Sequence, residues 1–320
     1  MNAVPADLPT RPLLSVVAPV YRSRPLVAEF VRRVRAAASR VTEDFEVLLV
    51  EDGSPDDSWS AIAEECDKDR RIKGLQLSRN FGQQSGITAG LAHARGQYVV
   101  VMDSDLQDDP AYIPDLYRKC REGFDIVFAR KRQRRFSLWR NITTRIYYAL
   151  FRWLASVDYD PNIGAYSMVS RPVVDAFLTF GDYRRGYVIV LDWLGFRRAK
   201  VEVEHAQRPE GESAYTPWKL FSHAVTITLS YSDKPLLTSI YLGFALSLTS
   251  FLAGIWAVVR YFTTSVGVLA LGWTSLVVSQ FFLSGLVLMG LGIMGLYISR
   301  IFEQVKNRPI FVVRETRNVE

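Results

Sequence analysis

Two carboxylates and an amide stand at alternate positions in the first half of the chain, at Asp103, Asp105 and Gln107. Alternate residues of an extended segment point the same way, so these three side chains can converge on one point. Oxygen donors gathered in this way suit Mg²⁺ or Mn²⁺, which keeps further coordination positions for water and for the phosphates of a substrate. A solvated acidic turn would contain the same residues, so the surrounding elements must decide between the two interpretations.

The element expected before these residues places them at the edge of a sheet. The apolar run from Val99 to Met102 predicts a strand buried on both faces, and the carboxylates must then emerge at its carboxyl end. Further strands are expected at 14–20, 45–50, 72–77 and 123–129. Because helical patterns alternate with them, we predict an α/β domain with a doubly wound, mainly parallel sheet. Ligands bind outside the carboxyl ends of such strands, where Asp52 also falls.

Basic residues follow the last of these strands. The run from Arg130 to Arg135 is typical of a solvated face, but after a strand it is also placed to bend over an anionic diphosphate. The sequence contains neither a G-x-G-x-x-G nor a Walker A motif, which argues against dinucleotide-binding and P-loop proteins. Its two cysteines, Cys66 and Cys120, lack the spacing of a zinc or redox site, so we expect reduced thiols.

Apolar residues make up 49% of the 320 residues and gather toward the C-terminus. No charged residue lies from Leu236 to Val259 or from Tyr261 to Ser299. Because roughly 20 apolar residues span a bilayer as a helix, we expect two transmembrane helices within 236–299, joined near 263–273. A buried helical hairpin of a soluble protein is the alternative. Residues 1–235 hold nearly all the ionisable groups and are expected to form a globular domain.

The distribution of charge predicts the orientation of the chain in the membrane. The net charge is +6, and basic residues flank the apolar region on the side of both termini. They are Lys219, Lys234, Arg300, Lys306, Arg308, Arg314 and Arg317. We therefore expect a multi-pass protein of the inner membrane, with the 1–235 domain, the 300–320 tail and both termini in the cytoplasm. No early apolar stretch predicts a signal peptide.

Two segments of the N-terminal part, near 137–155 and 217–231, combine apolar, aromatic and basic residues at helical spacing. Basic amphipathic helices rich in aromatic residues lie at membrane surfaces. Periodicity alone is equally consistent with helices packed on the core of the domain. The neighbouring apolar stretches favour the interfacial position.

Five short motifs occur in order along the chain, at Ala18–Tyr21, Glu51–Ser54, Asn80–Gln83, Asp103–Gln107 and His205–Tyr215. Together they resemble the motifs of the family 2 glycosyltransferases that act on polyprenyl phosphates. These include the dolichol-phosphate mannose synthase, bactoprenol glucosyltransferase and undecaprenyl-phosphate 4-deoxy-4-formamido-L-arabinose transferase types. The resemblance covers nearly the whole chain. It implies a GT-A fold, a UDP- or GDP-linked sugar donor, a polyprenyl phosphate acceptor in the lipid bilayer, and Mg²⁺ or Mn²⁺ as cofactor.

The resemblance also implies roles for particular residues. Donor binding falls to Pro19, Tyr21, Val50, Asp52, Gln83 and Ser104. Arg130 and Arg208 would contact phosphate, with Ser213 and Tyr215 ordering the loop that carries Arg208. The metal would be held by Asp103, Asp105 and Gln107, and the catalytic set would be Asp103, Asp105, Arg130 and Arg208.

The implied reaction is an inverting, metal-dependent transfer of the sugar to a polyprenyl phosphate. A phosphate monoester loses its second proton with a pKa of about 6, so at neutral pH it needs little help from a general base. This matters because Ala165 stands where some members carry an aspartate proposed as a base. Arg22-Ser23 and Ala214 also differ from the family pattern, at one nucleotide contact and one phosphate contact.

The expected product is a polyprenyl-phosphate sugar for modification of cell-envelope glycans or lipids, with the sugar itself left open among UDP- and GDP-linked candidates. One alternative is a processive polysaccharide synthase, although its Q-x-x-R-W motif is absent from the sequence. Another is a catalytically inactive membrane scaffold that binds nucleotide-sugar. The β-rich tail from Arg308 to Val313 predicts pairing with a neighbouring subunit, hence a homo-oligomer such as the tetramers of relatives. No nucleic-acid partner is expected.

Overall fold

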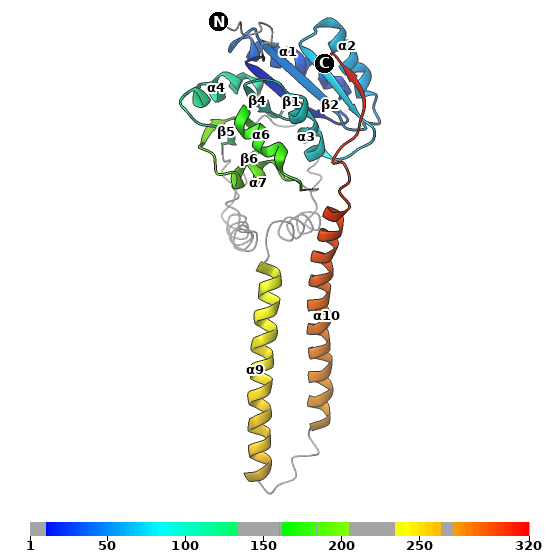
Figure 1. The fold of residues 1–320 in the computed structure, drawn as a ribbon, viewed down its shortest axis with the longest axis vertical. Helices are drawn as coiled ribbons and strands as arrows, with labels where there is room; N and C mark the ends of the chain where they lie inside the picture. Colours follow the sequence, from blue (N-terminus) through cyan, green and yellow to red (C-terminus); the bar gives the residue numbers. More distant parts are fainter. Residues whose placement is uncertain are drawn as a thin grey trace, which may run out of the picture. The chain divides into compact units, whose positions relative to one another are not determined.

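The computed structural model describes residues 11–132, 160, 162–182, 185–204, 234–263 and 272–319 (Figure 1). The chain divides into two compact units. The first unit comprises residues 1–137, 158–212 and 308–320, and the second comprises 138–157 and 213–307. The two expected interfacial segments, near 137–155 and 217–231, lie outside the described residues.

An eight-stranded sheet forms the centre of the first unit, in the order β7-β5-β6-β4-β1-β2-β3-β8. Its strands are β1 (Leu14–Val20), β2 (Phe45–Glu51), β3 (Ile72–Leu77), β4 (Tyr98–Val101), β5 (Ile126–Lys131), β6 (Ile163–Ser170), β7 (Arg198–Val203) and β8 (Val313–Arg317). The pairs β1–β2, β1–β4, β2–β3 and β5–β7 are parallel, whereas β6 and β8 run antiparallel to their neighbours. The expected α/β domain with a mainly parallel sheet is therefore confirmed.

Helices cover both faces of this sheet (Figure 1). On one face lie α1 (Val27–Ala38), α2 (Ser58–Lys68) and α4 (Ile113–Arg121), with the 3₁₀ turns η1 (Arg24–Leu26) and η2 (Pro110–Tyr112) before α1 and α4. On the other lie α3 (Gln83–His93), α6 (Arg171–Thr179) and α7 (Tyr187–Trp193). Two cores result, one on each side of the central strands, which explains why those strands are apolar on both faces.

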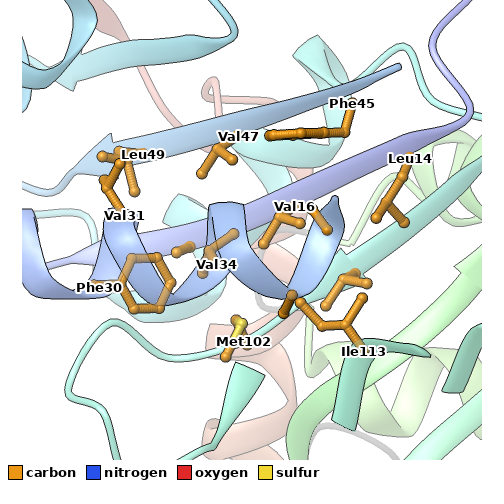
Figure 2. Packing of buried hydrophobic residues seen from close by; sticks show 14 of the residues in the cluster. Leu14, Val16, Phe30, Val31, Val34, Phe45, Val47, Leu49, Met102 and Ile113 are labelled. Atoms are coloured by element: carbon orange, nitrogen blue, oxygen red, sulfur yellow. The ribbon is translucent and has the colours of Figure 1, made fainter. Parts of the chain in front are cut away.

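Helix α1 shows how the sequence builds the first of these cores. Phe30, Val31 and Val34 are buried and recur at helical spacing, so they form one apolar stripe along the helix. Figure 2 shows this stripe packed on Val16 of β1 and Leu49 of β2. Neighbouring residues of the same strands, such as Val17, belong to the second core, as the alternation of side chains along a strand requires.

The cysteines are ordinary core residues. Cys66 of α2 and Cys120 of α4 are both buried and unbridged. Burial in apolar surroundings raises the pKa of each thiol to about 12. At neutral pH both are therefore neutral, unreactive thiols.

The C-terminal tail lies on the sheet of its own chain. Strand β8 pairs antiparallel with β3, and the Asn318 amide donates to the carbonyl oxygens of Cys66 and Ile72 at 2.8 and 2.9 Å. The tail was expected to pair with a neighbouring subunit, but here it covers the exposed edge of β3 within one chain. The oligomeric state stays a prediction.

The second unit contains two long helices, α9 (Lys234–Thr263) and α10 (Gly272–Val305). Among the described residues, one segment is long and apolar enough to cross a bilayer, Phe282–Val305 of α10. Helix α9 carries a shorter apolar segment, Leu236–Leu246. The expectation of two spanning helices is thus met in part, by α10. Large apolar side chains on both helices are exposed, among them Phe244, Phe251 and Leu288.

A glycine joins the loops that follow β2 and β3. Gly53 has a φ of +63°, in the left-handed region that favours glycine. A Cβ at this position would lie 2.4 Å from the backbone nitrogen of Asn80 and 2.5 Å from the carbonyl carbon of Arg79. The two loops can therefore touch only because residue 53 lacks a side chain.

Replacing Gly53 by alanine should lower the thermal unfolding midpoint of the protein in detergent. The backbone strain alone costs about 1–3 kcal/mol, and the clash with the next loop adds to it. Gly195→Ala is the matched control, because Gly195 has a φ of +71° while a Cβ there would meet only the Trp193 carbonyl at 4.0 Å. Equal shifts of the two midpoints would contradict the close contact of the loops.

Candidate active site

The candidate residues lie at the carboxyl ends of parallel strands. Tyr21 follows β1, Asp52 follows β2 and Asp103 follows β4. The chain builds the sheet outward from β1 to β2 and β3, then returns to place β4 on the other side of β1. Such a reversal of strand order opens a crevice at the sheet edge, which is the usual ligand site of an open α/β sheet.

The Asp-Ser-Asp segment forms a turn. Strand β4 ends at Val101, Leu106 has a left-handed φ of 62°, and the Asp105 carboxylate accepts the backbone N–H of Gln107 at 3.1 Å. The expectation that Asp103, Asp105 and Gln107 alternate along an extended segment is therefore wrong. The turn nevertheless brings the first two together, since the charge of Asp105 acts on Asp103. A metal role for Gln107 stays a prediction.

Asp103 is the most perturbed carboxylate of this edge. Its Oδ1 accepts a hydrogen bond from the Gln83 amide at 2.6 Å. Burial, together with the like charges of Asp108 and Asp105, raises the pKa of Asp103 to about 6. Because Gln83 opens α3, the bond joins the end of β4 to the first turn of that helix. Gln83 therefore lies next to Asp103, and its role in donor binding stays a prediction.

Asp108 is a residue that the sequence reasoning missed. Its side chain is 6% exposed, and its carboxylate accepts the backbone N–H of Asp103. Burial raises the pKa of Asp108, and the charge of Lys131 opposes that shift. The run Asp108-Asp109-Pro110 looks like an ordinary polar turn in the sequence. Only the hydrogen bond back to Asp103 shows that Asp108 holds the turn in place.

Two neighbouring cations end β5, and they have different partners. The Arg130 guanidinium donates to Asp160 at 3.0 Å and pairs with Glu202 at 3.7 Å. The positive charge of Lys131 instead acts on both Asp103 and Asp108. Adjacent residues of a strand point to opposite faces of the sheet, which explains why Arg130 and Lys131 have different partners. Lys131 is therefore the cation of β5 whose charge reaches the acidic turn, while a phosphate contact for Arg130 stays a prediction.

Asp52 organises the loop before α3. Its side chain is 3% exposed, and its two oxygens accept the backbone N–H groups of Phe81 and Gly82 at 2.7 and 2.8 Å. Burial raises the pKa of Asp52, while the two amide hydrogen bonds and Arg79 oppose the shift. Asp52 thus holds the backbone directly before Gln83. A contact between Asp52 and a nucleotide stays a prediction.

The other expected donor contacts differ in accessibility. Tyr21 is 43% exposed, with the Arg22 guanidinium 5.4 Å from the centre of its ring. Val50 is fully buried, so its side chain belongs to the core. The Ser104 hydroxyl donates to the Pro19 carbonyl at 2.9 Å and ties the acidic turn to the end of β1. Tyr21 is the most exposed of these three residues, and its donor contact stays a prediction.

Strand β6 borders β4 on the other side of the acidic turn. Ser167 of β6 is paired with Val101, the last residue of β4. Ala165 precedes Ser167 by two residues in β6 and so lies beyond the end of β4. The Ser167 hydroxyl contacts the Tyr187 hydroxyl at 2.9 Å. Position 165 is therefore an apolar neighbour of the site and supplies no proton acceptor.

Several expected residues lie outside the described part of the chain. They are Arg208, Ser213 and Tyr215, together with residues 133–135 of the basic run. Across the described ranges, no group of three or more His, Cys, Asp or Glu side chains is arranged to hold a metal ion by itself. A cation at Asp103 and Asp105 would therefore depend on additional oxygen ligands, such as those of a diphosphate.

Asp52→Asn should destabilise the protein. The asparagine side chain has one acceptor oxygen, so it leaves one of the two loop N–H groups unsatisfied in a buried place, at a cost of about 1–3 kcal/mol. The thermal unfolding midpoint measures this loss. Asp44→Asn, the same change at an exposed carboxylate, should leave the midpoint unchanged. A stable Asp52→Asn protein would show that the loop does not depend on these bonds.

Comparison with known proteins shows the family of the part of the chain that contains this edge. The family model described as glycosyl transferase family 2 matches residues 15–176, which include β1 to β6 and the acidic turn. The mannosyl-3-phosphoglycerate synthase from Rubrobacter xylanophilus shares the fold, with a TM-score of 0.50 and 16% identity over 68% of this chain and 73% of that chain. This likeness supports the GT-A-like α/β architecture.

Two sequence relatives cover almost the full length. The glycosyltransferase YkcC of Bacillus subtilis, whose name marks it as uncharacterized, is 32% identical over 308 residues, or 96% of this chain and 94% of the relative. The SfII prophage-derived bactoprenol glucosyl transferase of Shigella flexneri is 32% identical over 304 residues, or 95% and 98%. The chain is therefore a glycosyltransferase and belongs to glycosyl transferase family 2.

Proposed function

We propose that this glycosyltransferase transfers a sugar from a nucleotide-sugar to a polyprenyl phosphate, with inversion at the anomeric carbon and with Mg²⁺ or Mn²⁺ as cofactor. The observation that carries the proposal is the buried Asp103 with the like charge of Asp105 beside it, at the reversal of strand order. The similarity to a bactoprenol glucosyl transferase along nearly the whole chain supports a lipid phosphate as acceptor. The product would serve modification of cell-envelope glycans or lipids.

The residues at this edge fit a divalent cation. Asp103 is surrounded by the like charges of Asp108 and Asp105, an arrangement that a cation would stabilise. The donor atoms are carboxylate oxygens, which Mg²⁺ and Mn²⁺ prefer. Asp103 and Asp105 would hold the ion, and the bound ion would act as a Lewis acid toward the departing diphosphate.

The protein itself supplies fixed charge and orientation. The Gln83 amide holds the Asp103 carboxylate in one orientation, and Lys131 adds a positive charge close to the acidic turn. Groups that are fixed before the reaction stabilise developing charge without having to reorganise, which makes their electrostatic contribution to the rate large. Arg130 and Arg208 are proposed as further phosphate contacts.

The acceptor chemistry suits the apolar residue on β6. A phosphate monoester is largely ionised at neutral pH, so its oxygen can attack the anomeric carbon without a protein base. Ala165 is consistent with this, because no proton needs to be removed there. A direct displacement inverts the anomeric carbon as the nucleotide diphosphate leaves.

A membrane location follows from the acceptor and from the second unit. The segment Phe282–Val305 is suited to span a bilayer, and the exposed apolar side chains of α9 favour a second span. We propose a multi-pass protein of the inner membrane with the catalytic domain and both termini in the cytoplasm. Homo-oligomer formation is part of the same proposal.

Transfer to undecaprenyl phosphate tests the function directly. The purified protein would be incubated with Mg²⁺ or Mn²⁺, undecaprenyl phosphate and a panel of UDP- and GDP-linked sugars, and the lipid product would be identified by mass. Asp103→Ala should reduce turnover by roughly 10²–10³-fold, the usual effect of losing one electrostatic stabiliser of the transition state. Asp44→Ala is the matched control at the opposite edge of the sheet, before β2, and should retain full turnover. Unchanged turnover in Asp103→Ala, or in excess chelator, contradicts the proposal.

A further inference from the structure

The described residues directly before α7, Arg185 and Gly186, lie at the same edge of the sheet as the acidic turn. Helix α6 begins at the opposite edge, where the Arg171 guanidinium donates to the carbonyl oxygens of Gly96 and Ala94, just before β4. The helix therefore runs toward the carboxyl ends of the strands. After Gly186, the Tyr187 N–H donates to the Gln84 side chain at 2.8 Å, and Gln84 is next to Gln83 of the site.

One of these two residues is a buried arginine to which the proposed chemistry has given no role. Arg185 is 9% exposed, its guanidinium lies 5.8 Å from the centre of the Phe177 ring, and its Nε donates to the Asp182 carbonyl at 3.3 Å. Burial lowers the pKa of Arg185, and the nearby charge of Asp182 opposes the shift. A guanidinium begins from so high a pKa that it stays charged.

The partners of Arg185 differ from those of other buried or half-buried arginines. Arg171 of the same helix pair directs its donors to carbonyl oxygens and to Asp175, and Arg130 is paired with Asp160. Among the residues that the structure describes, no carboxylate lies within ion-pair distance of Arg185. The charge of Asp182 acts on the guanidinium only from beyond ion-pair distance. Holding a charged guanidinium out of water without a direct ion pair is costly, so an anionic ligand would stabilise it.

The order of the strands indicates which anion this is. The proposed nucleotide contacts, Tyr21 and Asp52, follow β1 and β2, on one side of the acidic turn after β4. Arg185 belongs to the other side, because the next residues, in α7, pack on β6 and Tyr187 contacts Ser167. The donor and the acceptor must approach the anomeric carbon from opposite sides for an inverting displacement.

We infer that Arg185 binds the phosphate group of the acceptor, a prenyl monophosphate, on the β6 side of the site. The guanidinium presents a planar set of donors that matches phosphate oxygens, and it offsets the repulsion between the acceptor phosphate and the donor diphosphate. Because position 165 of β6 is an alanine, the acceptor side would hold a cation that attracts an anion and no base at that position. The inference rests on the proposed function and specifies its acceptor site.

Binding of farnesyl phosphate and farnesol to the full-length protein in detergent separates the phosphate from the hydrocarbon chain. The wild type should bind farnesyl phosphate more tightly than farnesol. Arg185→Gln should weaken farnesyl phosphate binding by about ten-fold or more, the value of a charge-assisted hydrogen bond, and leave farnesol binding unchanged. Binding of UDP or GDP with Mg²⁺ should also be unchanged. Arg185→Lys keeps the charge but loses the paired donors, so its affinity for farnesyl phosphate should lie between those of the wild type and Arg185→Gln.

Arg171→Gln is the matched control, a second arginine of the same region whose partners are at the opposite edge. It should lower the unfolding midpoint and leave farnesyl phosphate binding intact. Unchanged farnesyl phosphate binding in both Arg185 variants would overturn the inference, as would a loss confined to UDP or GDP. If the wild type itself does not distinguish farnesyl phosphate from farnesol, the proposed acceptor class fails along with the inference. The test uses two variants, so that binding to Arg185→Lys can still be measured if Arg185→Gln does not fold.

Discussion

Like charges held out of water at the end of β4 are the constraint on which the rest of this site depends. Asp103 carries the charges of Asp105 and Asp108 beside it, and burial adds to their effect on its pKa. Without compensating partners, such an ionised carboxylate would destabilise the fold or take up a proton. The surrounding structure supplies a Gln83 hydrogen bond and the charge of Lys131, and the remaining excess of negative charge suits a divalent cation.

Hydrogen bonds between loops keep these groups in one place. Asp52 binds two N–H groups of the loop before α3, Gly53 lets that loop approach closely, and Ser104 ties the acidic turn to β1. Each loop leaves the carboxyl end of a different strand, so the bonds convert separate connections into one rigid edge. Rigid support of this kind is what makes electrostatic stabilisation effective, because the donors need not move as charge develops.

Sequence reasoning located β1 to β5 and the acidic pair because both depend on local patterns, but it did not predict β6 and β7. Apolar runs bounded by turns predicted β1 to β4, and Asp103 and Asp105 had to emerge from a buried strand. Features set by tertiary contacts were missed or wrong. The turn at Leu106, the bond from Asp108 to Asp103 and the burial of Arg185 have no local signature. Strand β8 pairs within its own chain, a choice that a β-rich tail alone does not reveal.

Manganese binding measured by electron paramagnetic resonance, with and without UDP or GDP, tests the central claim most directly. The described residues contain no self-sufficient metal cluster, so the ion should bind weakly alone and more tightly when a nucleotide diphosphate adds its oxygens. Asp105→Ala should abolish the nucleotide-dependent binding. Equal manganese affinity with and without nucleotide, or unchanged binding in Asp105→Ala, would contradict a metal held jointly by the acidic turn and the donor.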